Sequence, residues 1–400
     1  MTAASPTPAA VALLTALIEG IDAALPRATE LRREIHRHPD LGGSEGPTTA
    51  RLSDALGLAA TPLADTGFHV RLGPGGPSVA IRAELDALPV TEATDVDWAS
   101  RNAAMHACGH DVHMAGVFAV LEAAKSLDLP VGMVGLFQPR EECQPSGAPD
   151  VLDSGVLASE EIGAVIGAHV QPRVARGVIS TGVGGVNAAA DAFDIVVRGH
   201  GGHGAYPHVT VDPMPILAAI TLGLHELVGR SINPVRPALI TVGKIDAGTV
   251  HNVIPEFGSL HGIIRTMHAE DRAHLHADIR RLAEHTAAAR GATAEVHLLR
   301  GDPVLSNDRE LVHATDGLLT ALGLTVAEDP FRSLGADDFS HYGLRVPIVM
   351  IFVGTGEESG TRHDVGLHHP RYLPADDSVR QVAIALAAGW VAGAELAGAI

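Results

Sequence analysis

Short runs of apolar residues alternate along much of the chain with stretches in which apolar residues recur every three or four positions. A short continuous apolar run is typical of a buried strand, and the longer spacing is typical of a helix with one buried face. The alternation of the two predicts an α/β domain with a largely parallel sheet. The predicted strands are Ser78–Glu84, Val131–Phe137, Ala164–Val170 and Val346–Phe352, and the predicted helices are Asp111–Ser126, Asp308–Leu322 and Asp376–Ala397.

The middle of the chain has a different order of elements. A strand, a helix, two strands, a second helix and a last strand follow one another, which is the order of a ferredoxin-like α+β unit. We therefore expect a smaller domain, residues 186–300, inserted into a larger domain formed by residues 1–185 and 301–400. Its predicted strands are Asp191–Arg198, Ala238–Ile245, Ser259–Met267 and Thr293–Leu299, and its predicted helices are Pro213–Gly229 and Glu270–Arg290.

Charge and composition argue against several kinds of partner. The net charge of -19 disfavours nucleic acid and anionic membrane surfaces, because phosphate binding needs clustered Lys and Arg. The N-terminal apolar stretch has no basic residue before it, which predicts a surface helix and not a secretory signal. The C-terminal apolar stretch, residues 382–400, predicts a buried helix and not a membrane span. With only two cysteines, these features indicate a cytoplasmic protein.

The strongest chemical signal is the segment MHACGHDVHMAG, residues 105–116. Cys108 and His110 lie two positions apart just before a predicted helix, so a thiolate and an imidazole could reach one metal ion or a metal pair. The alternative is a tight turn with Gly109 at the bend and Asp111 as the helix N-cap. A disulfide between Cys108 and Cys143 is possible, but metal binding is the better interpretation in a cytosolic chain.

Paired carboxylates follow another predicted strand. Glu141 and Glu142 come after the strand that ends at Phe137, and α/β enzymes bind ligands at the carboxyl ends of parallel strands. Because neighbouring side chains diverge, one carboxylate can hold a metal ion while the other faces a water molecule. The alternative is a solvated acidic loop.

Three further places offer polar groups at or near a strand end. His169 closes a predicted strand, and His368 and His369 precede a predicted helix. Glu84 and Asp86 lie two apart and so share one side, from which they could orient a ligand. Each group could instead be structural or solvated, but their joint occurrence favours zinc or a similar transition ion. The chain has no GxxxxGK[ST] phosphate loop and no GxSxG nucleophile elbow.

With these residues identified, the chain resembles the metal-dependent aminoacylases, hippurate hydrolases and plant auxin-conjugate hydrolases, the amidohydrolase branch related to carboxypeptidase G. The resemblance extends over almost the whole chain, from LRREIHRHPDLGGSE to LHHPRYLPADD. Five blocks occur in the order found in that family, and two more lie in the predicted inserted domain. The five blocks are RAELDALP, MHACGHD, FQPREE, GAHV and LHHP, and the two in the predicted inserted domain are GHGGHGAYPH and HNVIP.

The resemblance implies a role for each matching residue. Glu141 would be the general base, and Asp86 would orient a ligand histidine. His203, in the inserted domain and often supplied by a partner subunit in that family, would stabilise the oxyanion, while Asn252 and Arg265 would hold the substrate carboxylate. Two divalent ions (zinc, manganese or cobalt) would be held by a bridging Cys108 and by His110, Glu142, His169 and His368.

The implied activity is hydrolysis of a small amide, most simply an N-acyl amino acid. The alternatives are a dipeptidase or carboxypeptidase on the same site, an inactive homologue that binds a small molecule, or a scaffold protein without metal. The chain departs from the family pattern at three places. Glu84 stands where Asp is more common, and His369 stands where Ser or Asn is usual. The run Cys143-Gln144-Pro145-Ser146 follows the paired Glu where a small or Gly-rich run is more common. Closure of the inserted domain as a lid would bring His203 to the site and exclude water. The sheet edge of that domain would pair with its twin in a homodimer or higher homo-oligomer.

Overall fold

The computed structural model describes residues 6–356 and 365–400, which form two compact units. The first unit consists of Met1–Gly184, Ser306–Phe331 and Asp338–Ile400, and the second of Gly185–Leu305 and Arg332–Asp337. The expected end of the inserted domain at residue 300 therefore lies before the end of this segment of the second unit at Leu305. Residues 332–337, which we had assigned to the larger domain, belong to the second unit because the carbonyls of Ser333 and Gly335 accept hydrogen bonds from the Ala188 amide at 3.1 and 3.0 Å.

The first unit is built on one eight-stranded sheet. Its strands are β1 (Thr61–Leu63), β2 (Gly67–Leu72), β3 (Ser78–Glu84), β4 (Gly132–Gln138), β5 (Ile162–Ala175), β6 (Val178–Ser180), β15 (Thr325–Val326) and β16 (Ile348–Gly356). They lie in the order β1-β2-β4-β3-β5-β16-β6-β15. The four central strands β4, β3, β5 and β16 are parallel, whereas β2 and β6 are antiparallel to their inner neighbours. The predicted α/β class with a mostly parallel sheet is confirmed.

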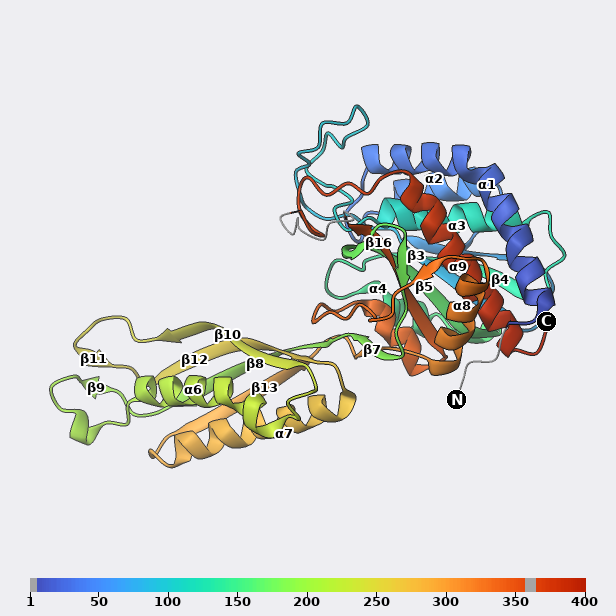
Figure 1. The fold of residues 1–400 in the computed structure, drawn as a ribbon. Helices are drawn as coiled ribbons and strands as arrows, with labels where there is room; N and C mark the ends of the chain where they lie inside the picture. Colours follow the sequence, from blue (N-terminus) through green and yellow to red (C-terminus); the bar gives the residue numbers. More distant parts are fainter. Residues whose placement is uncertain (1–5, 357–364) are drawn as a thin grey trace. The chain divides into compact units, whose positions relative to one another are not determined.

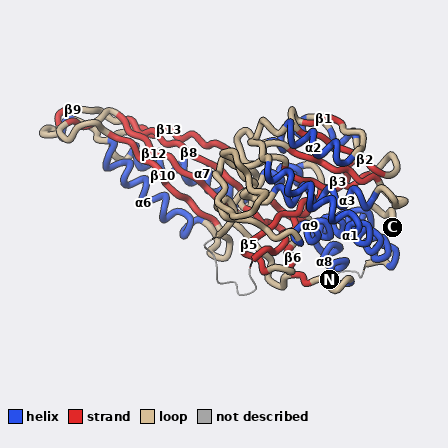
Figure 2. The backbone as a smooth tube through the Cα atoms, turned by 90° about the horizontal axis from the view of Figure 1, so that it is seen from above, coloured by secondary structure: helices blue, strands red, loops and turns tan. Residues whose placement is uncertain are grey.

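Helices cover the sheet of this unit and complete its core. They are α1 (Pro8–Arg37), α2 (Gly46–Leu56), α3 (His110–Ala124), α4 (Gly147–Asp153), α5 (Val156–Ser159), α8 (Arg309–Ala321), the 3-10 helix η2 (Asp338–Leu344) and α9 (Asp377–Leu396). The three helices α1, α3 and α9 pack against one another, and α3 and α9 also contact the central strands (Figures 1 and 2). Trp390 of α9 and Phe118 of α3 are buried in the core between these layers.

The predicted elements agree with the structure in type, and one difference affects the site. β3 and β4 are buried along their whole length, as expected of central parallel strands covered on both faces. β5 continues to Ala175 and does not end at Val170, so His169 lies inside a strand and not at its end. The pairing of β5 with β3 stops at Gly167, but its pairing with β16 continues past His169, and this keeps the segment extended.

Within residues 6–356 and 365–400, two helices are long and apolar enough to cross a membrane by length and composition alone. In α9, 78% of the apolar window is buried inside the unit, in agreement with the buried C-terminal helix that was predicted. In α1 the corresponding share is 28%, and its buried residues, such as Leu14, Leu17 and Ile21, recur every three or four positions. Both helices therefore have the pattern of helices that pack on a protein core.

The second unit has a four-stranded antiparallel sheet with two helices on one face (Figure 1). Its strand order, β10-β12-β8-β13, together with the chain order strand-helix-strand-strand-helix-strand, is that of the predicted ferredoxin-like fold. The elements are β8 (Ala189–Arg198), α6 (Pro213–Ser231), β10 (Ala238–Ala247), β12 (Phe257–Thr266), α7 (Ala269–Ala288) and β13 (Thr293–Arg300), with a small hairpin of β9 (Gly202–His203) and β11 (Val253–Ile254), the 3-10 helix η1 (Pro207–Val209), and β7 (Gly184–Asn187) and β14 (Leu305–Asn307) at the unit boundaries.

Candidate functional site

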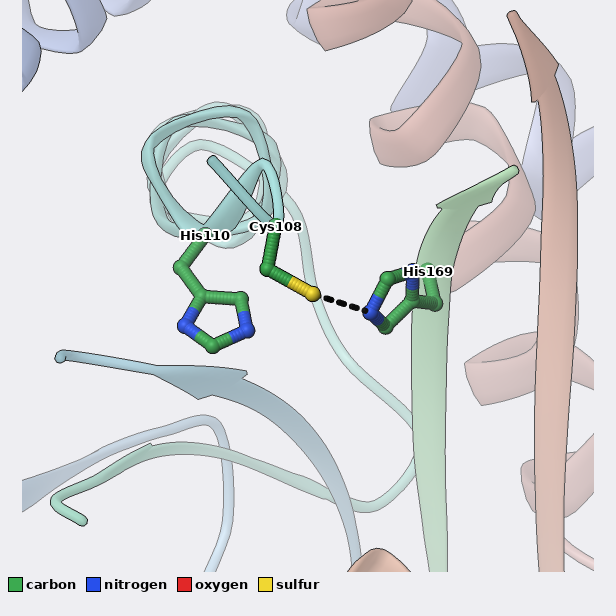
Figure 3. A group of neighbouring side chains, drawn as sticks. All are labelled: Cys108, His110 and His169. Atoms are coloured by element: carbon green, nitrogen blue, oxygen red, sulfur yellow. Dashed lines mark hydrogen bonds between the residues drawn. The ribbon is translucent and has the colours of Figure 1, made fainter. Parts of the chain in front are cut away.

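The turn before α3 places two of the predicted ligands. Gly109 has a φ of +90°, and a Cβ at this position would lie 2.4 Å from a methyl group of Val170, so the turn requires glycine. Beyond this bend the side chain of Cys108 points towards His169 on β5, and the ring of His110 lies on the other side of Cys108 (Figure 3). The Cys108 Sγ lies 3.4 Å from Nε2 of His169.

The alternative of an Asp111 N-cap is wrong. The helix N-cap is Gly109 and no side chain caps it. The Asp111 carboxylate is instead buried and accepts a hydrogen bond from Nε of Arg32 at 2.9 Å. The disulfide alternative is not realised either, because Cys108 and Cys143 are both free thiols.

The predicted ligands gather in overlapping groups whose donor atoms all lie within 4.8 Å of one another. Cys108 belongs to two of these groups, one completed by His110 and His169 and the other by Glu142 and His368. A further group joins His110 to Glu141 and Glu142. A thiol shared between two sets of donors is the arrangement that a bridging ligand of a metal pair requires.

Hydrogen bonding leaves suitable lone pairs available for a metal ion. In His110, Nδ1 donates to the backbone carbonyl of Asp86 at 2.8 Å, while the buried Nε2 has no hydrogen-bond partner within the part of the chain that the structure describes. This Nε2 lies 3.7 Å from Oε2 of Glu141 and 3.9 Å from Oε1 of Glu142, which is too far for a hydrogen bond. In His169, Nδ1 donates to the Val170 carbonyl at 2.7 Å, so that Nε2 carries the lone pair near Cys108.

The charges of the site also fit a bound cation. Burial alone would lower the pKa of His110, but Glu84, Asp86 and Glu142 outweigh it and raise the value to about 10. Burial, together with Glu142 and Glu141, raises the pKa of the Cys108 thiol, while burial lowers the pKa of His169. The carboxylates thus attract positive charge to the site, and a metal ion would supply it and deprotonate the thiol. The nitrogen, oxygen and sulfur donors present suit zinc or a similar ion.

Asp86 forms hydrogen bonds with two of the predicted ligands, one through its backbone and one through its carboxylate. Its backbone carbonyl accepts the hydrogen bond from His110, whereas its carboxylate Oδ2 accepts the backbone amide of Glu142 at 2.8 Å. Glu141 and Glu142 lie in the loop that follows β4, and each side chain is little exposed. The solvated-loop alternative for this pair is therefore wrong.

His368 and His369 differ sharply although they are neighbours. His368 has a φ of +66°, its amide donates to the Ala107 carbonyl at 2.9 Å, and its Nε2 lies 3.3 Å from Oε1 of Glu142. The Nδ1 of His369 accepts the backbone amide of Arg371 at 3.1 Å, which stabilises the following turn. His369 joins none of the candidate metal groups formed by the described residues, so its departure from the family pattern adds no ligand to those groups.

Sequence reasoning missed His113. It lies one helical turn after His110 on α3, and its ring packs against that of His169 with centroids 4.6 Å apart. Its Nδ1 bonds Oε2 of Glu84 at 2.8 Å. The signal was available in the segment MHACGHDVHMAG, because residues three apart share one face of a helix.

The remaining predicted residues belong to the second unit. His203 and Val253 pair in the β9–β11 hairpin, so the segments GGHGA and HNVIP lie side by side. His203 is exposed, and its Nδ1 accepts the backbone amide of Ala205 at 3.0 Å. Asn252 is also exposed and its carbonyl accepts the Gly204 amide at 2.8 Å, whereas Arg265 is half-buried on β12. Their roles in substrate binding stay predictions.

Comparison with known proteins identifies the family. The model of peptidase family M20/M25/M40 matches residues 80–388. N-acetylcysteine deacetylase of Bacillus subtilis is 33% identical over 363 residues, which cover 88% of this chain and 93% of the relative. Thermostable carboxypeptidase 2 of Saccharolobus solfataricus is 34% identical over 345 residues, covering 82% and 86%.

A solved structure leads to the same result. The crystal structure of the Bacillus subtilis YXEP protein, described as a dinuclear metal binding peptidase from the M20 family, matches with a TM-score of 0.80 at 28% identity. The match covers 92% of this chain and 98% of that one. With the family match over most of the chain and these relatives beside it, the chain belongs to peptidase family M20/M25/M40 and is a metal-dependent hydrolase of amide bonds.

Proposed function

We propose that this protein hydrolyses the amide bond of an N-acyl amino acid, using two divalent ions (zinc, manganese or cobalt). The observation that carries the proposal is the pair of donor groups that share Cys108, with Glu141 beside them. The names of two relatives, N-acetylcysteine deacetylase and N-acetyl-L-cysteine deacetylase, support an acylated amino acid as the class of substrate.

In this proposal the ligands are Cys108, His110, Glu142, His169 and His368. When bound, the metal ions polarise the amide carbonyl and acidify a water molecule. Asp86 keeps His110 in the tautomer whose Nε2 can bind metal, because the Asp86 carbonyl accepts the proton of Nδ1. Burial of Cys108 and His169 excludes bulk water from the donors.

Glu141 is the proposed general base. Its Oε2 lies 3.7 Å from Nε2 of His110, so it borders the ligands without completing either Cys108 group. From this position the carboxylate takes a proton from the attacking water and passes it to the leaving amine, which avoids expulsion of an unstable amide anion. His203, Asn252 and Arg265 are proposed, from the family resemblance alone, to stabilise the oxyanion and hold the substrate carboxylate.

A carboxypeptidase activity is the second candidate, and the relatives named thermostable carboxypeptidase 1 and 2 favour it. Both reactions break an amide next to a free carboxylate. They differ in whether an acyl group or a peptide lies on the other side of that bond, so a substrate panel separates them.

We also propose a cytoplasmic homodimer or higher homo-oligomer that binds neither nucleic acid nor membranes. The edge strand β10 supports self-association, since its outer side has no partner strand in the described chain and Ile245 is exposed there. Leu222 on α6, 68% exposed, adds apolar surface to the second unit. Light scattering of the purified protein at several concentrations tests the self-association, and a protein that stays monomeric at all of them would contradict it.

The decisive test joins metal content to turnover. The purified protein is freed of metal, reloaded with manganese, zinc or cobalt, and incubated with N-acyl amino acids and dipeptides while mass spectrometry follows the products. We expect metal-dependent release of the free amino acid from the acylated substrates. Release from dipeptides alone would favour the carboxypeptidase, and a protein that binds no metal would overturn both candidates.

A further inference from the structure

His113 is a buried histidine at the centre of the site, yet the proposed reaction does not use it. It is 0% exposed and lies beside two ligands, with ring centroids 5.5 Å from His110 and 4.6 Å from His169. Its donor atoms group with those of Glu84 and His110 within 4.8 Å, which would by itself suggest another metal ligand.

The hydrogen bonds of His113 exclude that role in this arrangement. The backbone amide of Val170 donates to Nε2 at 3.0 Å, so this nitrogen has its lone pair occupied. The other nitrogen, Nδ1, must then carry the ring proton, and it donates that proton to Oε2 of Glu84 at 2.8 Å. With both nitrogens engaged, His113 has no lone pair left for a metal ion.

The contact with Val170 occurs where β5 has lost its pairing with β3 on one side and is paired only with β16 on the other. The ladder between β3 and β5 ends at Arg82 and Gly167, three residues before Val170. His113 thus supplies an acceptor from α3 for an amide beyond the end of that ladder. Both backbone polar groups of Val170 are then held, since its carbonyl accepts from Nδ1 of His169.

Glu84 fixes the proton on the correct nitrogen of His113. It is 1% exposed and is itself held by an ion pair with Arg82. Arg82 is in turn fixed by Asp338, at 2.8 Å, and by Gln138, at 2.9 Å. A buried carboxylate in this setting only accepts hydrogen bonds, and it therefore selects the tautomer of His113 that can accept from Val170.

We propose that Glu84 and His113 form a positioning pair, which fixes the orientation of His169 and so sets the affinity of one of the two metal ions. The inference rests on the proposed metal pair. The chain of contacts runs from Arg82 through Glu84 and His113 to the backbone of Val170, next to the ligand His169. It ends without touching substrate or metal.

Cobalt titration of the apoprotein tests the pair without reference to turnover. Absorption spectroscopy follows the Cys108 charge-transfer band and the ligand-field bands, and elemental analysis counts the bound ions. The variants are His113→Ala, which removes both hydrogen bonds, and His113→Gln, whose amide oxygen can still accept from Val170. The matched control is Met114→Ala, which opens a cavity at the next position of α3, also fully buried, and removes no hydrogen bond to Val170 or Glu84.

We expect His113→Ala to weaken one cobalt equivalent about 10- to 100-fold while the other equivalent is retained, as for other partners of ligand histidines. His113→Gln should recover part of the loss, and Met114→Ala should bind as the wild type does. The positioning role would be overturned if His113→Ala bound both cobalt ions as tightly as the wild type does. It would also be overturned if His113→Ala and Met114→Ala weakened both ions to the same extent. If His113→Ala does not fold, the same comparison between His113→Gln and the wild type decides. A wild type that binds no cobalt would instead overturn the proposed function.

Discussion

The two units present their predicted functional residues in opposite ways. In the first unit the predicted ligands Cys108, His110 and His169 are buried and their donor atoms lie close together, although the predicted ligand His368 is 53% exposed. In the second unit His203 and Asn252 are exposed, and the Nδ1 of His203 accepts the backbone amide of Ala205 in its own turn.

This difference reflects what each kind of group must do. A metal site has to hold several donors within a few ångströms before the ion arrives, so its ligands need a buried framework of hydrogen bonds. A group that contacts a small substrate has to stay accessible, and a hairpin such as β9–β11 leaves it so. We therefore expect changes in the first unit to affect metal content or the chemical step, and changes in the second unit to spare the metal.

The largest expected effect is at Glu141 in the first unit. Glu141→Gln keeps the size of the side chain but removes the base, so turnover should fall about 10²- to 10⁴-fold while both metal ions stay bound. Steady-state kinetics and elemental analysis of the same sample measure the two quantities. Glu142→Gln is the contrasting variant and should lose metal; full turnover in Glu141→Gln would refute its assignment.

In the second unit the corresponding change is His203→Ala. Loss of an oxyanion donor should lower kcat about 10²- to 10³-fold and leave the metal content of the first unit unchanged. His208→Ala, an exposed neighbour on η1, serves as the control and should have wild-type kinetics. If His203→Ala turned over substrate normally, the role taken from the family resemblance would not apply to this chain.

The two cysteines provide a matched pair within the first unit. Cys108→Ser should weaken metal binding at least about 100-fold, because a neutral hydroxyl is a poorer donor than a thiolate, and the difference from the wild type should shrink as pH falls and protons compete with metal for the wild-type thiolate. Cys143→Ser should retain metal, since Cys143 belongs to none of the donor groups among the residues described. Competition with a chromogenic chelator at several pH values gives both affinities, and identical values would remove Cys108 from the ligands.

The last prediction concerns the pH dependence of the free energy of unfolding, for a buried histidine in the first unit and an exposed one in the second. Burial alone would lower the pKa of His36, but Asp111 and Glu92 outweigh it and raise the value to about 9. The stabilisation is therefore fully present below the unfolded pKa of about 6.5 and is lost as pH rises through about 9, with at most about 3 kcal/mol involved.

Urea unfolding at pH 6 and above pH 9 measures this effect. His36→Gln should flatten the pH dependence of the free energy of unfolding. His297→Gln is the control in the second unit, where the pair of His297 with Glu295 is more than half exposed and contributes little. If the free energy of unfolding of His36→Gln depended on pH as that of the wild type does, the contacts of His36 with Asp111 and Glu92 would not control this dependence.

Much of the fold was readable from the sequence because the periodicities were strong. β3 begins and ends where the apolar run Ser78–Glu84 does, and the order of elements in the second unit identified its ferredoxin-like fold. The end of β5 was not predictable, since it depends on pairing with β16, which comes from far along the chain. The same holds for residues 332–337, which join the second unit through backbone hydrogen bonds to Ala188.

The sequence by itself determined the types of ligand, their order and the family, because those properties reside in short motifs such as MHACGHD and FQPREE. Only the tertiary structure decided which atoms form the hydrogen bonds of the buried site. The Asp86 carbonyl accepts a hydrogen bond from Nδ1 of His110, and Nε2 of His113 accepts the amide of Val170, next to His169. These roles depend on which groups from distant segments fill each hydrogen bond in the buried site, and a one-dimensional pattern carries no information about that.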